Sequence, residues 1–277
     1  MSDFKDYKLG SIESPLDLRD YRISKLVNVG KQYPDSYYIK YNGQIKDQGT
    51  VGSCVAHSLS YIKEIQEEKE SNVFSYFSPG FIYANRTKND YQGEGMIAKE
   101  ALKCLLNKGE VHQYDFPFNY EYDRIKPIFK QYNALNYLNN VAAEYKIGTY
   151  FKIESFNDLK MSLISYGPAT VSVPIYSNFY TIDNENYHIG LPDKDDICLG
   201  RHQMTILGYD NDEIYLLNSW GKYFGKDGYC YIPFNYPGLE IWGVTDTKFP
   251  KPNKIIMKIK KYLNKFVVFF SKKSKKI

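Results

Sequence analysis

The sequence has no long apolar run and little cysteine. Nowhere do about eighteen apolar residues follow one another, so no segment has the pattern of a membrane-spanning helix. The first residues, Met-Ser-Asp-Phe-Lys-Asp, contain none of the apolar stretch that a secretory signal needs. We therefore expect an intracellular protein, or one packaged in a virus particle.

The cysteines are few and far apart. There are 4 of them, at positions 54, 104, 198 and 230, and no two form a Cys-x-x-Cys pair. That spacing favours neither a zinc site nor a redox dithiol. We expect no metal and no cofactor.

What the chain does contain is enough apolar material for a core. Hydrophobic residues make up 43% of the 277 residues and aromatic residues 17%. A chain of this length and composition can form one large domain or two lobes.

The net charge of +4 is unevenly distributed. Residues 254–277 contain nine lysines and no acidic residue, so the rest of the chain carries a net charge of −5. Apolar residues recur between these lysines at nearly helical spacing, which predicts a basic amphipathic helix. Such a helix binds an anionic membrane surface or a partner's groove. A solvated tail remains the alternative, and nucleic acid is expected to bind only non-specifically.

A glycine-flanked cysteine lies where a loop is expected to become a helix. Residues 48–57 read Gln-Gly-Thr-Val-Gly-Ser-Cys-Val-Ala-His, and apolar residues at helical spacing follow to about Lys69. Cys54 is thus predicted in the first helical turn, where unpaired backbone N–H groups and the helix dipole favour the thiolate. Gln48 could direct an amide N–H at an oxyanion beside the sulfur.

Two strand-like runs far downstream supply a base and a group to orient it. His202 precedes one apolar run and Asn218 ends the next, with a turn at residues 210–213 between them. The two side chains should therefore lie side by side, and the Asn carbonyl can fix the tautomer of the imidazole. His57, three residues after Cys54, is the rival base, although no orienting Asn lies near it in the sequence.

These segments together resemble papain-like (cathepsin-type) cysteine peptidases. The Gln, Gly-Ser-Cys, His and Asn-Ser-Trp-Gly segments occur in the family's order over roughly residues 34–245. The resemblance implies an α+β fold with two lobes, one helical and one β-barrel-like, and an active site in the cleft between them. We expect a helical lobe at 34–150, a β-rich lobe at 151–250 and the basic tail at 251–277.

The implied activity is hydrolysis of peptide bonds through a covalent thioester. Cys54 would attack the carbonyl of a polypeptide substrate, His202 would transfer protons, Asn218 would orient His202, and Gln48 would stabilise the oxyanion. Two alternatives stay open. The fold could serve as a catalytically silent binding protein, or the thioester could pass to an amine in an acyl transferase.

Substrate-binding positions follow only from the resemblance. The family's glycine-rich turn grips an extended substrate, which assigns Gly93 and Gly95 here, with a plain turn as the alternative. Ser172 and Gln203 correspond to the pocket for the second substrate residue, which is usually apolar in the family. Trp220 is expected to cover the His202–Asn218 hydrogen bond and exclude water from it.

Residues 1–33 precede the part that resembles the mature enzyme. The segment Pro15 to Tyr21 is short, polar and punctuated by proline, which favours an extended strap. The strap could be a small inhibitory propeptide lying across the cleft, or a permanent packing arm.

Overall fold

The computed structural model describes residues 4–23, 32–87, 90, 93–118 and 135–246. These residues belong to one compact unit, Met1–Asp246, while a second unit, Thr247–Ile277, lies outside the described residues. The predicted basic amphipathic helix falls in that second unit. In the described ranges, no helix combines the length and apolarity needed to cross a bilayer.

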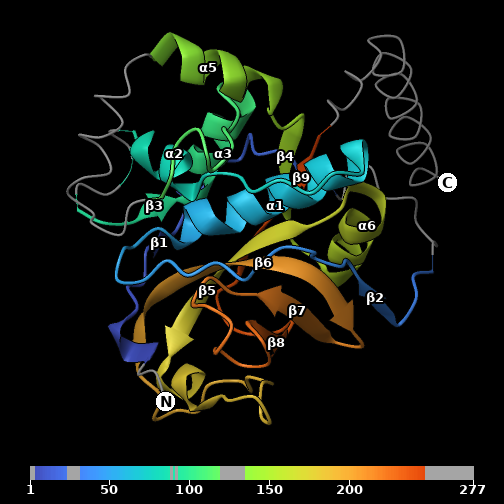
Figure 1. The fold of residues 1–277 in the computed structure, drawn as a ribbon. Coiled ribbons are helices and arrows are strands. Elements are labelled where there is room, and N and C mark those ends of the chain that lie inside the picture. The colour runs from blue at the N-terminus through green and yellow to red at the C-terminus, as the bar shows by residue number, and fades with distance from the viewer. Residues whose placement is uncertain (1–3, 24–31, 88–89, 91–92, 119–134, 247–277) are drawn as a thin grey trace, which may run out of the picture. The chain divides into compact units, whose positions relative to one another are not determined.

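A long buried helix, α1 (Cys54–Ser71), is the central element of the first unit. It ends where Asn72 adopts the left-handed conformation (φ 58°) and its N–H bonds the Glu68 carbonyl at 2.9 Å. Side chains on nearly every face of its first three turns are buried, as expected of a helix enclosed by other elements. Figure 1 shows α1 between helices α2, α3 and α5 above it and strands β5–β8 below it.

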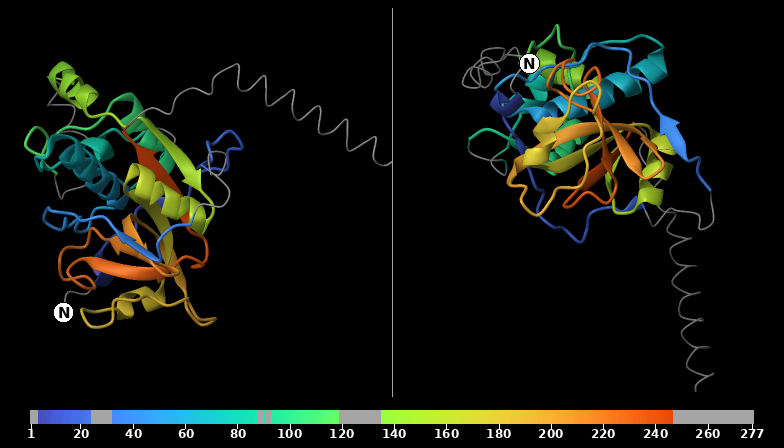
Figure 2. Two further views of the ribbon diagram at one scale, coloured as in Figure 1. Left: turned by 90° about the vertical axis from the view of Figure 1, so that its right-hand side faces the viewer. Right: turned by 90° about the horizontal axis from the view of Figure 1, so that it is seen from below.

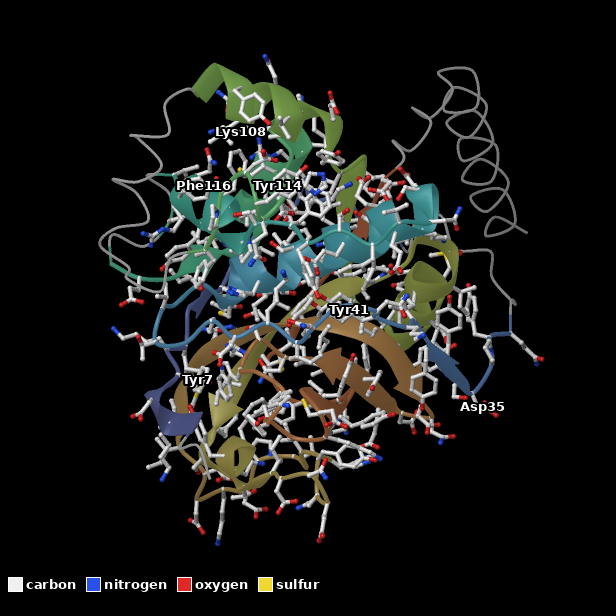
Figure 3. The ribbon with its side chains drawn as sticks, in the orientation of Figure 1. Tyr7, Asp35, Tyr41, Lys108, Tyr114 and Phe116 are labelled. Atoms are coloured by element: carbon white, nitrogen blue, oxygen red, sulfur yellow. The ribbon has the colours of Figure 1, made fainter. Side chains whose placement is uncertain are left out.

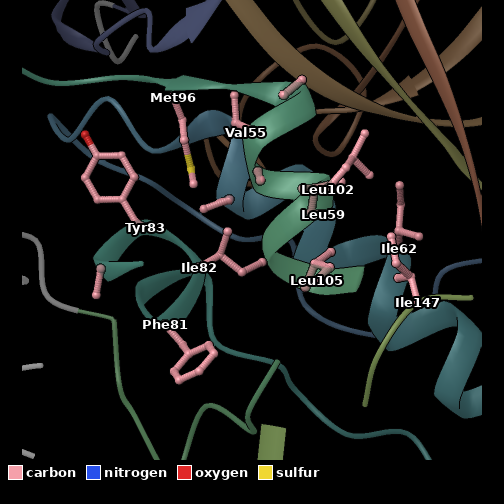
Figure 4. Packing of buried hydrophobic residues seen from close by; sticks show 14 of the residues in the cluster. Val55, Leu59, Ile62, Phe81, Ile82, Tyr83, Met96, Leu102, Leu105 and Ile147 are labelled. Carbon is pink, nitrogen blue, oxygen red and sulfur yellow. The ribbon is translucent and has the colours of Figure 1, made fainter. Parts of the chain in front are cut away.

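Three further helices pack on one side of α1: α2 (Pro79–Ala84), α3 (Ala98–Asn107) and α5 (Leu135–Glu144). Ser78 caps α2, because its hydroxyl accepts a 3.0 Å hydrogen bond from the Phe81 N–H, and Pro79 is the first helical residue. The shared core is shown in Figure 4, and its labelled members include Val55, Leu59, Ile62, Phe81, Leu102 and Leu105.

An open sheet of seven strands packs on the other side of α1. Its order is β4-β9-β5-β6-β7-β8, with β2 also paired to β6. The sheet does not close in the described part of the chain, so our expectation of a β-barrel-like lobe describes it only loosely. In the left view of Figure 2 the orange strands of the sheet lie below the blue-green and green helices. The strands are β2 (Ser36–Tyr38), β4 (Thr149–Ile153), β5 (Ala169–Tyr176), β6 (Cys198–Asp210), β7 (Glu213–Leu217), β8 (Tyr229–Pro233) and β9 (Glu240–Thr245).

The hairpin that carries the predicted base and its orienter is formed by β6 and β7. The strands pair in antiparallel register from Thr205↔Leu217 to Asp210↔Glu213, so the turn lies where the sequence predicted it. Helix α6 (Phe156–Tyr166) and the 3-10 helix η3 (Ser177–Thr181) connect other strands. The domain boundaries at residues 33, 150 and 250 remain predictions.

The N-terminal segment crosses from the sheet side to the helical side. After the 3-10 helix η1 (Phe4–Asp6), strand β1 (Ser11–Ile12) pairs in parallel with β3 (Met96–Ile97). In Figure 1 this dark-blue segment passes the end of α1 at which the helix begins. That end of α1 carries Cys54.

Candidate active site

Cys54 is the first residue of α1 and is fully buried. Gly49 takes the left-handed conformation (φ 56°), which permits the tight turn that leads into the helix. Burial raises the pKa of the Cys54 thiol to about 11, although the backbone N–H groups of Gln203 and Gly10 act to lower it. The sulfur therefore lies beside β6, the strand that carries His202.

His202 and Asn218 meet as the sequence predicted. His202 Nε2 and Asn218 Oδ1 are 2.6 Å apart, and the Ser219 N–H donates to the same Oδ1 at 2.7 Å. Because that oxygen can only accept, Nε2 carries the proton and Nδ1 is a free acceptor. His202 Nδ1 is buried and has no hydrogen-bond partner among the described residues. Burial lowers the pKa of His202 to about 4, although its hydrogen bond to Asn218 acts to raise it.

Trp220 packs against the imidazole. The ring centroids of Trp220 and His202 are 4.6 Å apart, and only 1% of Trp220 is exposed. Phe224 lies edge-on to the indole, with centroids 5.2 Å apart. The contacts agree with the position expected of a cover over the His202–Asn218 hydrogen bond, and the exclusion of water from that bond stays a prediction.

Buried hydroxyl groups join α1 to the sheet one turn beyond Cys54. The Ser58 hydroxyl lies 2.8 Å from that of Thr170 on β5 and 3.0 Å from that of Thr205 on β6. Thr205 also donates to the Ser58 carbonyl at 3.0 Å. These contacts fix the register between the helix that begins at Cys54 and the strand that contains His202.

Gln48 is fully buried next to this site. Its Oε1 accepts a 2.7 Å hydrogen bond from the Ser219 hydroxyl, and its Nε2 donates to the Val51 carbonyl at 2.9 Å. The same Nε2 donates to the Lys8 carbonyl at 3.0 Å. The amide predicted to bind an oxyanion thus holds a carbonyl oxygen of the N-terminal segment.

The turn containing Gly93 and Gly95 is anchored by Arg86, which donates to the Gly93 and Gly95 carbonyls at 2.7 and 3.2 Å. Gly95 has φ 108°, a conformation that favours glycine. Met96, the residue after the turn, pairs with an extended segment, and this segment is β1 of the same chain. The Met96 N–H donates to the Gly10 carbonyl at 2.8 Å.

Ser172 and Gln203 lie opposite each other on β5 and β6 and are buried. Both contact Ser11, whose hydroxyl is 2.7 Å from that of Ser172 and donates to Gln203 Oε1 at 3.0 Å. Arg201 donates to the Ser172 hydroxyl at 3.0 Å. The surroundings are polar, as these residue types indicated.

The rival base His57 has a different environment. Its Nδ1 lies 3.0 Å from the Ser53 carbonyl, and its ring meets Phe118 edge-on with centroids 4.7 Å apart. Burial lowers the pKa of His57 to about 3. These contacts belong to a packed core histidine, one turn along α1 from Cys54.

Sequence reasoning did not single out Ser219 or Glu94. The Ser219 hydroxyl fixes the orientation of the Gln48 amide. Its place next to Asn218 in the Asn-Ser-Trp-Gly segment could have indicated that Ser219 lies in the site. Glu94 accepts from the Gly52 N–H at 2.7 Å and pairs with Lys8 at 2.7 Å. These contacts join residues 42 and 86 positions apart, so no local pattern indicates them.

Among the described residues, no three His, Cys, Asp or Glu side chains form a group that could hold a metal ion. All four cysteines are free thiols.

A helix that begins at a cysteine, packed on an open sheet that carries a histidine and an asparagine, is the architecture of papain-like proteins. The structure resembles xylellain, a cysteine protease from Xylella fastidiosa, with a TM-score of 0.72 at 21% identity over 88% of this chain and 97% of that one. It also resembles digestive procathepsin L 3 from Tenebrio molitor, with a TM-score of 0.61 at 18% identity over 79% of this chain and 72% of that one.

The sequence comparisons give the family. Residues 34–240 match the model of the papain family cysteine proteases, so the chain belongs to that family. An uncharacterised peptidase C1-like protein of Acanthamoeba polyphaga mimivirus is 24% identical over 70% of this chain, and mouse cathepsin K is 26% identical over 79%. The chain spans 65% of the length of each of these two relatives.

Proposed function

We propose that this protein is a cysteine peptidase that hydrolyses peptide bonds through a thioester on Cys54. In the first half-reaction the Cys54 thiol gives its proton to His202 Nδ1, and the sulfur attacks the substrate carbonyl carbon. The carbonyl oxygen becomes an oxyanion, which the Gln48 amide and the Cys54 backbone N–H stabilise. The C–N bond then breaks, and the amine leaves with the proton from His202.

The second half-reaction restores the enzyme. Water gives a proton to His202 and attacks the thioester carbonyl, and the C–S bond breaks as a carboxylic acid is released. The sulfur recovers its proton from His202. Asn218 keeps the imidazole in the tautomer that both steps require, with Nε2 protonated and Nδ1 available.

One observation supports this proposal above the others. His202 Nε2 is bound to Asn218 Oδ1 at 2.6 Å, while Nδ1 is buried without a hydrogen-bond partner among the described residues. The next residue of the strand is Gln203, whose backbone N–H acts to lower the pKa of the Cys54 thiol. A histidine that serves only the packing of a core satisfies its polar atoms, as a buried acceptor without a partner is costly. An unpaired acceptor at this place is what a general base needs.

The test is hydrolysis of a fluorogenic peptide library by the wild-type chain and by Cys54→Ala. We expect cleavage that is abolished by Cys54→Ala and retained by Cys104→Ala, a matched change at a buried cysteine on α3. Cleavage that persists in Cys54→Ala would refute the proposal.

The same assay tests the two alternatives. A silent binding protein gives no cleavage by any variant, even when Cys54 is open to small alkylating reagents. An acyl transferase gives an amide product when an amine acceptor is supplied, at the expense of hydrolysis. The proposed ligand in each case is a polypeptide, which is cleaved, transferred or only bound.

We further propose that the enzyme acts inside a cell or a virus particle, which the mimivirus relative supports. Detection of the chain in purified particles or in a cell lysate is expected, and its restriction to the culture medium would contradict this location. Binding of an anionic membrane, or weakly of nucleic acid, through residues 254–277 remains a prediction about residues that the structure does not describe.

A further inference from the structure

An aromatic row crosses one face of the sheet, where its side chains are half-buried or exposed. The strand register aligns Tyr38 on β2, Gly208 on β6, Tyr215 on β7 and Tyr231 on β8. His188 extends the row, because it pairs with Tyr231 in an isolated bridge. Residues directly opposite each other in an antiparallel sheet share a face, so these side chains are neighbours. The proposed catalysis uses none of them.

A hollow of about 370 Å³ lies along this row. It is lined by residues 38–41 and by Tyr215, Tyr229 and Tyr231. Gly208 contributes no side chain to fill the space between Tyr38 and Tyr215. A Cβ at Gly208 would lie 2.2 Å from the Tyr37 carbonyl oxygen and 3.1 Å from Tyr38 Cδ1, so β2 could not approach β6 as it does. The missing side chain therefore leaves room for a ligand beside Tyr38.

The rings around the hollow contact one another through their faces. Tyr215 and Tyr229 stack with centroids 5.1 Å apart and an interplanar angle of 7°, and Tyr231 and His188 stack at 4.6 Å and 4°. Tyr38 meets Tyr215 at 84°, with centroids 5.4 Å apart. A nucleobase stacks on a free aromatic face, as does a sugar ring. Because these faces contact each other, the hollow mainly offers ring edges and hydroxyl groups, which favours neither ligand.

Hydrogen-bond donors line the hollow. The Tyr231 hydroxyl donates to that of Tyr38 at 3.3 Å, which leaves the Tyr38 proton for another acceptor. Burial raises the pKa of Tyr215, so its hydroxyl keeps its proton. The exposed Lys40 adds an ammonium group to the same lining. A polyproline II segment has no internal hydrogen bonds, and its backbone carbonyls are acceptors for such donors.

Acidic groups lie at the turn between β6 and β7, next to this row. Asp210 and Glu213 pair across that turn, and burial and the charge of Asp210 both raise the pKa of Tyr38. Glu213 also pairs with His188 at 2.8 Å. These carboxylates attract a basic residue and repel a phosphate backbone.

The row has the length of a short peptide. From Tyr38 to His188 it includes five neighbouring positions, and four strand spacings of about 4.8 Å amount to roughly 19 Å. A polyproline II helix rises about 3.1 Å per residue, so about six residues match this length.

We propose that this aromatic groove binds a proline-rich, basic segment of a partner polypeptide in the polyproline II conformation. Proline rings enter the space beside Gly208, and backbone carbonyls accept hydrogen bonds from the tyrosine hydroxyls and Lys40. An arginine or lysine next to the prolines pairs with Asp210. Grooves lined by aromatic residues recognise such segments because the ligand is already ordered before it binds. The inference goes beyond peptide hydrolysis, since a partner held here does not need to enter the active site.

The probe is a fluorescein-labelled oligoproline with an arginine at each end, and the control peptide has glycine in place of alternate prolines. Binding to the full chain with Cys54→Ala, which prevents cleavage, is followed by fluorescence anisotropy. We expect saturable binding of the probe and at least about tenfold weaker binding of the control, because the flexible chain loses more entropy. Equal affinities of the two peptides, or no saturation by about 1 mM probe, would overturn the proposal.

The location is tested with Tyr38→Ala and the matched control Tyr114→Ala. Both tyrosines are exposed, Tyr38 by 46% and Tyr114 by 77%. Figure 3 labels Tyr114 among the helices and Tyr41, which lines the hollow, below α1 beside the sheet. We expect Tyr38→Ala to weaken probe binding about tenfold or more, and Tyr114→Ala to bind like the parent chain. The same affinity in both variants would show that the probe binds elsewhere, against the proposal.

A second variant keeps the test decisive if Tyr38→Ala shows no cooperative thermal transition. Lys40→Ala changes an exposed side chain of the same lining, and we expect about fivefold weaker binding, the equivalent of about one hydrogen bond. Unchanged affinity in Lys40→Ala would overturn the proposal. Asp210→Asn should weaken binding of the arginine-ended probe and leave an oligoproline without arginine unaffected. Equal effects on these two peptides would contradict recognition of a basic residue.

Other ligand classes give a different result. Binding of a soluble cello-oligosaccharide or of oligothymidylate that is lost in Tyr38→Ala, without binding of the oligoproline, would refute the peptide as ligand. Because all of these measurements use Cys54→Ala, they stand apart from the peptidase proposal. Probe binding supports the groove whether or not the wild-type chain cleaves peptides.

Discussion

The orientation of the Gln48 side chain is fixed at both of its polar atoms. Ser219 donates to Oε1 at 2.7 Å, which leaves Nε2 to donate toward the nucleophile turn and the Lys8 carbonyl. Because the amide cannot rotate without losing the Ser219 bond, the donor is preorganised, and such donors stabilise a developing oxyanion strongly.

We predict that Gln48→Ala lowers kcat for peptide hydrolysis by about a hundredfold to a thousandfold. The loss is measured at saturating substrate, since Gln48 also donates to the Lys8 carbonyl at 3.0 Å and its removal changes that contact as well. Gln113→Ala, a change at an exposed glutamine, is the control. A loss of less than about threefold would show that this amide is not an oxyanion donor.

A second residue-level prediction concerns His57. Burial lowers its pKa to about 3, from an ordinary value of 6.5, so between these values the unfolded chain binds a proton that the folded chain does not. The contribution of His57 to stability is therefore lost as pH falls below about 6.5. Replacing it with Gln should cost stability at pH 7 and cost less, or nothing, at pH 4.

The measurement is the difference in Tm between His57→Gln and the wild type across that range. Glu64, Glu110 and Asp246 have pKa values raised by burial, so their contributions have the opposite pH dependence. These contributions are common to both proteins and cancel in the difference. A difference that is constant with pH would contradict a buried neutral His57.

At the scale of elements, the proposed catalysis depends on how α1 packs against β5 and β6. The hydroxyl groups of Ser58, Thr170 and Thr205 form a fully buried cluster one turn beyond the nucleophile. Buried polar groups that hydrogen-bond to one another fix one relative position of the helix and the sheet, whereas a purely apolar contact allows the two to shift.

Thr205→Val should test this junction. The substitution keeps the shape but leaves the Ser58 carbonyl without its 3.0 Å donor, which costs about 1–3 kcal/mol of unfolding free energy. Urea denaturation gives the value, and Thr181→Val, at an exposed threonine on η3, gives the baseline. Equal losses in the two variants would show that the cluster does not stabilise the junction.

Helices and local turns could be predicted from the sequence, and the sheet only in part. The start of α1 and the β6–β7 turn follow from local signals, namely the glycines before Cys54 and the polar turn at 210–213. Strand β9 lies between β4 and β5, far from both in sequence, and was not anticipated. Such pairings depend on contacts between distant segments, which local propensity does not encode.

At the scale of the molecule, the contact between His202 and Asn218 could be predicted from the sequence, whereas the path of the N-terminal segment could not. His202 and Asn218 are joined by a short turn, so their contact follows from the hairpin alone. The route of residues 7–14 is set by single contacts with Gln48, Met96 and Ser172, each dozens of positions or more away. No periodicity could distinguish a strap in the cleft from one packed beside it.

The central claim is that Cys54 and His202 share a proton. The most direct measurement is the pH profile of Cys54 alkylation by a small reagent, in the wild-type chain and in His202→Ala. We predict reaction well below the ordinary thiol pKa, lost when His202 is replaced, because the imidazolium stabilises the thiolate. A single transition near the ordinary thiol pKa, unchanged by His202→Ala, would contradict the account.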